Sequence, residues 1–138
     1  MTTSATPNLK EFARDLLIHE AATGTRVGDD GSAVFRVCEK LRGPLGRLMG
    51  ITGYRSLLSR ALALASAEAP RLSGLQIKPD GSLAGVSELE SKLDVRTVTQ
   101  SEAILVSHLV GLLVTFIGPA LTQQLLRDVW PKMDELDF

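Results

Sequence analysis

Arginines interspersed with glycines are the residues best suited to chemistry in this chain. The segment 36–60 carries six basic side chains and one acidic side chain, although the whole chain has a net charge of -1. A glycine bend before a helix leaves backbone N–H groups free to meet an anion, and guanidinium groups bind phosphate through paired hydrogen bonds. The candidate anion or nucleic-acid contacts are Arg42, Arg47, Arg55 and Arg60. The simpler interpretation, which we prefer, is that these arginines solvate helix surfaces and pair with acidic residues elsewhere.

The imidazole bases do not form a catalytic pattern with a nucleophile. Nucleophilic catalysis needs a nucleophile, a base and a group that orients the base, and the chain has two histidines, His19 and His108. Ser107 is next to His108, but neighbouring residues of a helix point in different directions. We therefore interpret His108 as a core or interface residue with one hydrogen-bonded nitrogen, and His19 as a surface or capping residue. An enzyme would need a polar pocket near His108.

The acidic pairs and the cysteine also favour a protein without a catalytic or metal site. The pairs Asp29/Asp30 and Glu88/Glu90 lie in polar segments, where the pKa of a carboxyl group shifts little. The single cysteine, Cys38, excludes an internal disulfide framework and a multi-cysteine zinc site, and its apolar neighbours predict burial. We expect no enzyme activity, no cofactor and no metal.

Small side chains in the most apolar stretch predict a helix-packing face. Ser107, Gly111 and Thr115 are four residues apart, so they share one face of a helix with His108 at its edge. Small residues at this spacing let another helix approach closely. Two interpretations remain: the face packs against a helix of the same chain, or it meets a second copy of the protein.

The stretch 103–117 that contains this face predicts the centre of the fold. Apolar residues surround it on every side, which is typical of a buried helix. Thr99 or Ser101 with Glu102 predicts its N-terminal cap, and Gly118 with Pro119 predicts its end. A membrane span needs roughly 20 apolar residues, and this run is shorter and contains polar side chains, so we expect no membrane partner.

The remaining elements are predicted from periodicity and turn residues. The pattern predicts helices over 8–22, 33–41, 53–69, 86–93 and 120–129, short helical turns joined by bends over 43–53, a linker over 96–100, and a β-hairpin over 75–84 that turns at 79–81 and lies on the helices. In the helix 86–93, Ser87 and Glu90 predict a capping box.

The length and composition of the chain indicate its fold class and the number of its domains. A chain of 138 residues with 44% apolar and 4% aromatic residues is long enough for one core and favours helix packing. We expect an all-α fold: a single compact helical domain of five or six helices, one of them buried and central, with a small β-hairpin and flexible tails at 1–6 and 132–138.

The expected function follows from these exclusions. It is a non-enzymatic protein–protein interaction or regulatory module, homodimeric or bound to another protein. The location is expected to be cytoplasmic, since the N-terminus resembles no secretory signal. The alternative is nucleic-acid or phosphate-ligand binding through the segment 36–60.

Overall fold

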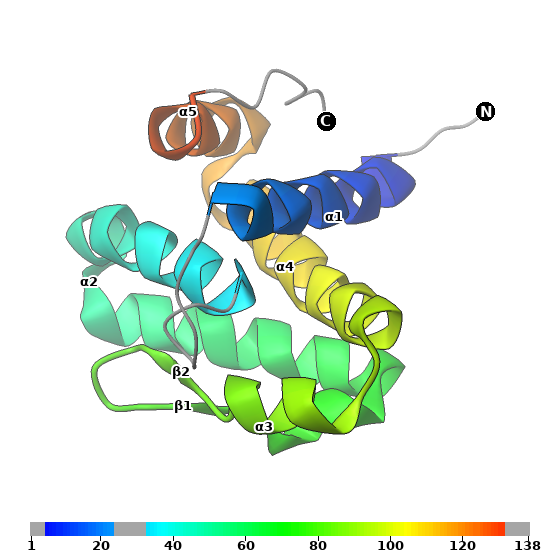
Figure 1. Cartoon of the computed structure of the whole chain (residues 1–138). Coiled ribbons are helices and arrows are strands. Elements are labelled where there is room, and N and C mark those ends of the chain that lie inside the picture. The colour runs from blue at the N-terminus through cyan, green and yellow to red at the C-terminus, as the bar shows by residue number, and fades with distance from the viewer. Residues whose placement is uncertain (1–4, 24–32, 132–138) are drawn as a thin grey trace.

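The computed structural model describes residues 5–23 and 33–131, and the fold is all-α with one small β-hairpin, as predicted (Figure 1). The elements follow in the order α1 (Ala5–Thr23), α2 (Ala33–Glu68), the 3-10 helix η2 (Pro70–Gly74), β1 (Gln76–Ile77), β2 (Leu83–Ala84), α3 (Val86–Lys92), α4 (Val95–Ile117) and α5 (Pro119–Val129). Helix α1 includes residues 5 and 6, which the sequence assigns to a tail. The tail predicted at 132–138 lies outside the described residues.

Helix α4 is the centre of the fold, which confirms the prediction for the stretch 103–117. It contacts α1, α2, α3, η2 and α5. Five of its aliphatic side chains lie completely out of reach of solvent: Leu105, Val106, Leu109, Val110 and Leu113. Figure 1 shows α1 and the two arms of α2 arranged around it. The core of the molecule is therefore built on this one helix.

Helix α2 is a helical hairpin, which differs from the predicted pattern of several bends. Gly50, with φ 79° and ψ 158°, is the one non-helical residue inside it, and the two arms fold back beside each other (Figure 1). The Tyr54 hydroxyl on the second arm donates a hydrogen bond of 3.0 Å to the carbonyl of Cys38 on the first. The bends predicted at Gly43 and Gly46 are wrong: both glycines are helical, because burial of the first arm outweighs their weak helix propensity.

The capping predictions for α3 and α4 are also wrong. Helix α4 begins at Val95, before the predicted cap, because the Asp94 carboxylate accepts a hydrogen bond from the Thr97 amide and so starts the helix earlier. The predicted linker 96–100 is consequently helical. Helix α3 begins at Val86, after Gly85 with φ 91° at the N-cap position, so Ser87 lies inside the helix and is not its N-cap.

The β-hairpin is confirmed, and it lies on the bend of α2. Its strands pair antiparallel with Gln76 opposite Ala84. The Asp80 carboxylate accepts hydrogen bonds from the amide and hydroxyl of Ser82, which fixes the turn. A Cβ atom at Gly81 would lie 3.0 Å from the side chain of Ile51 and 3.3 Å from that of Tyr54, so the turn needs a glycine there. The hairpin thus gains stability from contact with α2.

Helix α4 is the one helix in the ranges 5–23 and 33–131 that is long and apolar enough to cross a membrane. Half of its most apolar window is buried inside the protein, and the core helix of a soluble protein has the same length and composition. These properties are weak evidence for a membrane span. The expectation that the protein has no membrane partner remains a prediction.

Candidate functional site

The four candidate arginines lie at different places on the two arms of α2. Arg42 forms an ion pair with Glu39 and donates a hydrogen bond of 3.2 Å to the carbonyl of Asp80 in the hairpin turn. Arg55 is half-buried. Arg47 and Arg60 are exposed. Neither forms an ion pair with another described residue. Arg42 therefore acts as a link between α2 and the hairpin, and Arg47 and Arg60 are available to a partner.

The predicted small-residue face lines one shallow hollow beside α1 and α2. Ser107, His108, Gly111 and Thr115 all contribute to this hollow of about 410 Å³. A Cβ atom at Gly111 would lie 3.7 Å from the Leu9 side chain, which is ordinary van der Waals contact. The hydroxyls of Ser107 and Thr115 donate to carbonyls of their own helix, at 2.9 Å and 3.1 Å. The face lies beside helices of the same chain, without an unusually close approach.

His108 is partly exposed and takes part in a charged cluster. Its Nε2 lies 2.6 Å from one oxygen of Glu68, whose other oxygen lies 3.2 Å from the Lys10 ammonium. The hydrogen bond with His108 and that with Lys10 lower the pKa of the Glu68 carboxyl. The Ser107 hydroxyl bonds to the Ile104 carbonyl instead of to His108. The cluster joins α1, α2 and α4, and it provides no activated serine.

A buried ion cluster that the sequence does not predict joins both ends of the described chain. The Glu20 side chain is completely buried, and its oxygens lie 2.9 Å from Arg36, 2.6 Å from Lys40 and 2.5 Å from the indole nitrogen of Trp130. Burial by itself raises the pKa of Glu20, but the hydrogen bonds from these three side chains outweigh it and hold that pKa below its usual value. The cluster has a structural role, since every group in it already has a partner.

An exposed apolar surface lies where the bend of α2 meets the end of α4 and the start of α5. One hollow of about 530 Å³ lies between the second arm of α2 and the end of α4, and a second of about 340 Å³ adjoins it along α5. They share Leu48 and Ile117. We call the two hollows together the apolar groove; its lining residues are Pro44, Arg47, Leu48, Met49, Gly53, Ser56, Leu57, Arg60, Phe116, Ile117, Leu121, Gln124, Leu125 and Asp128.

Three large apolar side chains of the apolar groove are exposed to solvent. Phe116 is 64% exposed, Leu48 is 52% exposed and Leu121 is 43% exposed. Isolated exposed leucines are normal on a protein surface, but a contiguous apolar patch is a mark of an interaction site. Arg47, Arg60 and Asp128 place charges of both signs around the apolar residues. The surface thus has the apolar centre and charged rim of a protein interface.

The sequence identifies Arg47 and Arg60 of the groove as candidate contact residues, but it does not predict that apolar residues of the groove are exposed. The pattern of 103–117 predicts burial for Phe116 together with its neighbours, whereas α4 extends beyond the core at this end. The predicted break at Gly118 is the one signal that helix packing ends here. Within 5–23 and 33–131, no three His, Cys, Asp or Glu side chains come together in a way that could hold a metal ion.

Comparison with protein-family models, with curated proteins and with solved structures finds no match to this chain.

Proposed function

We propose that this protein is a non-enzymatic interaction or regulatory module of the cytoplasm, and that the apolar groove is the surface on which it forms a homodimer. The observation that carries the proposal is the exposure of Phe116 and Leu48 beside hollows of the same surface. An exposed phenylalanine costs solvation free energy that burial in a partner recovers, at roughly 25 cal/mol for each Å² of apolar surface.

A second copy of the chain suits this surface because the same patch carries both exposed apolar side chains and hollows. A two-fold dimer brings the same patch of both copies together, so each copy must offer both protrusions and hollows. Phe116 and Leu121 supply protrusions, and the hollow between α2 and α4 can receive a side chain of the partner. Arg47 and Asp128 both line the adjoining hollow along α5, and no ion pair joins either of them to another described residue. Each can pair with its opposite in the other copy.

Light scattering on a sizing column tests the proposal. We expect a mass of about twice 14.8 kDa that persists in high salt, because the contact is mainly apolar. Phe116→Lys should weaken the dimer about 30-fold or more, since a central aromatic anchor contributes about 2 kcal/mol or more. The lysine is compatible with the last turn of α4, where the helix dipole favours positive charge.

Val95→Glu is the matched control. Val95 is an exposed apolar residue at the other end of the same helix, where the dipole favours negative charge. This variant should keep the dimer. A monomeric wild-type protein at all concentrations, or a Phe116→Lys protein that is still a dimer, contradicts the proposal; circular dichroism verifies that each variant is folded.

The second candidate function is binding of nucleic acid or a phosphate ligand, and it is favoured by the exposure of Arg47 and Arg60 without ion pairs to other described residues. In this alternative the affinity for mixed DNA or RNA falls steeply as salt rises. The same column run distinguishes the two functions: nucleic acid that elutes with the protein at low salt and is removed at high salt supports the alternative, and a dimer free of nucleic acid at both salts supports the leading proposal.

A further inference from the structure

The larger hollow of the apolar groove has the volume and lining of a small-molecule site. We call it the α2–α4 hollow. Its volume of about 530 Å³ lies within the range of ligand pockets, which is about 300–1,000 Å³. Ser56 and Arg60 are the polar side chains among the described residues that line it. The others are one glycine and five apolar residues: Leu48, Met49, Gly53, Leu57, Phe116 and Ile117. Ligand pockets commonly combine an apolar wall with a few polar groups that fix the orientation of the ligand.

The polar side chains lie toward one end of the α2–α4 hollow. Gly53, Ser56 and Arg60 are three or four residues apart, so they share one face of the second arm of α2. Gly53 is next to the bend, and Arg60 lies about two helical turns farther along, which is roughly 10 Å. Leu48 lies just before the bend. The α2–α4 hollow is therefore apolar near the bend and polar at its far end.

Arg60 provides a positive charge at the polar end. It is exposed, and it forms no ion pair with another described residue. Ser56 is also exposed and lies one turn before Arg60. A guanidinium group binds a carboxylate through two parallel hydrogen bonds, and a serine hydroxyl can donate one more. One guanidinium balances one carboxylate, so the complementary head group carries a single negative charge.

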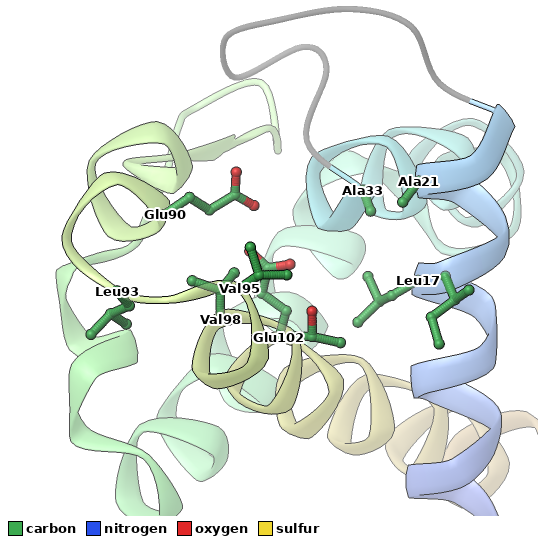
Figure 2. Close-up of a pocket in the computed structure, with 10 residues that line it drawn as sticks. Leu17, Ala21, Ala33, Glu90, Leu93, Val95, Val98 and Glu102 are labelled. Atoms are coloured by element: carbon green, nitrogen blue, oxygen red, sulfur yellow. The ribbon is translucent and has the colours of Figure 1, made fainter.

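The lining of another hollow shows why this charge is selective. A cavity of about 420 Å³ lies between α1, α3 and α4, and Figure 2 shows Glu90 and Glu102 among the aliphatic side chains that line it. A carboxyl group ionises less readily beside other carboxyl groups, so that cavity disfavours a carboxylate ligand. The described residues that line the α2–α4 hollow include no acidic side chain. An aliphatic carboxylate therefore matches the α2–α4 hollow in both its apolar wall and its charge.

We infer that the α2–α4 hollow binds a medium-chain aliphatic carboxylate, and that this binding and dimerisation exclude each other. The carboxylate accepts hydrogen bonds from Arg60 and Ser56, and the aliphatic chain lies against Leu57 and Phe116 and extends toward the bend. In the proposed dimer the same hollow receives a side chain of the partner, so the ligand and the partner compete for one place. The competition rests on the proposed function, whereas the binding of the carboxylate does not.

A titration of the isotope-labelled full chain with octanoate tests the binding, and octanol is the neutral control with the same chain. The protein concentration is kept low enough for the monomer to predominate. We expect the amide NMR signals of Gly53, Ser56 and Ile117 to shift, because these residues line the hollow. Octanoate should bind at least about tenfold more tightly than octanol. Equal affinity for the two compounds, or shifts confined to other parts of the chain, overturns the inference.

Two substitutions at exposed positions test the role of the charge. Arg60→Gln should weaken octanoate at least about tenfold and leave octanol unchanged. Ser56→Asp should have the same effect, because an aspartate one turn before Arg60 repels the ligand and pairs with the guanidinium. Arg96→Gln is the matched control, since Arg96 is an exposed arginine near the other end of α4, and it should leave octanoate binding unchanged. Unchanged octanoate affinity in Arg60→Gln also overturns the inference.

Light scattering tests the competition. At ten times its own dissociation constant, octanoate should weaken the dimer about 100-fold, because each of the two released copies binds one ligand. A dimer that octanoate does not weaken overturns the competition. A wild-type protein that is monomeric without octanoate, yet binds it through Arg60, would contradict the homodimer and support the carboxylate site. The two proposals therefore fail in distinguishable ways.

Discussion

Two buried glutamates of this fold have pKa values shifted in opposite directions, because their neighbours differ. Glu20 is surrounded by donors from Arg36, Lys40 and Trp130, which stabilise its charged form. Glu102 has aliphatic neighbours and a second carboxyl group, which stabilise its neutral form. The same amino acid thus acts as an anion at one buried position and as a neutral acid at another.

The Glu20 cluster should make the protein sensitive to acid. Because the folded-state pKa of Glu20 lies below its unfolded value, its contribution to stability is present above about pH 4.5 and is lost as pH falls further. Glu20→Gln should lower the free energy of unfolding at pH 7 by roughly 3 kcal/mol, the lower end of the range for a broken buried ion pair, because Lys40 is half exposed. Urea unfolding at pH 7 and pH 3 measures both effects; equal losses at the two pH values would contradict the charged state of Glu20.

Glu102 should have the opposite pH dependence. Its folded-state pKa is raised to about 10, so its contribution is fully present below about pH 4.5 and decreases as pH rises toward 10. Glu102→Gln keeps the shape of the neutral carboxyl group, so it should stabilise the protein by roughly 1–3 kcal/mol at pH 7 and have little effect near pH 4. Glu88→Gln, at an exposed position of α3, is the control and should have almost no effect at either pH. A destabilised Glu102→Gln protein at pH 7 would refute a neutral Glu102.

At the scale of elements, the bend of α2 depends on a single glycine. Gly50 has φ 79° and ψ 158°, a backbone region that residues with a side chain rarely adopt. Nothing lies within 4 Å of the position of an added Cβ atom, so the requirement for glycine comes from the backbone conformation and not from crowding.

Alanine at two glycines of α2 should therefore have effects of opposite sign. Gly50→Ala should lower the free energy of unfolding by roughly 1–3 kcal/mol, through strain at the bend. Gly46→Ala should raise it by roughly 0.5–1 kcal/mol, because Gly46 is helical and an added methyl group there also meets nothing within 4 Å. Urea midpoints with unchanged slopes measure both. Loss of stability in both variants would mean that the first arm is not a regular helix at Gly46.

The elements that the sequence predicts correctly are those with strong local signals. The break at Gly118 and Pro119, the hairpin turn at Asp80 and the apolar helix 103–117 depend on a few adjacent residues, and all are found. The start of α4 is missed because aspartate, threonine and serine can all cap a helix. Sequence alone does not rank Asp94 above Ser101, and the cap that forms is the earlier one.

The candidate site is predicted less well than the fold, because it depends on distant contacts. Arg47 and Arg60 are recognised from composition, but their position beside Phe116 results from the folding of α2 against α4. Glu102 carries a usable signal, since it shares the helical register of Val98, Leu105 and Leu109, which are all buried. Glu90, which contributes to the raised pKa of Glu102, comes from another helix and could not be identified from spacing.

At the scale of the whole molecule, we expect α1 to α5 to unfold together. Helix α4 contacts every other helix, and the Glu20 cluster joins α1, α2 and the end of α5. Trp130 is the single tryptophan, so its fluorescence reports this junction, whereas circular dichroism reports all helices. The two urea transitions should coincide. An earlier fluorescence transition would show that α5 separates before the rest of the molecule unfolds.

The hydrogen bond between Trp130 and Glu20 also limits how early during synthesis the contacts of Glu20 can all form. Arg36 and Lys40 follow Glu20 by 16 and 20 residues, but Trp130 follows it by 110. A nascent chain that has emerged only as far as α4 can therefore form the ion pairs of Glu20 while the indole donor is still missing. Final closure of the amino-terminal helix must wait for nearly the last described residue to leave the ribosome.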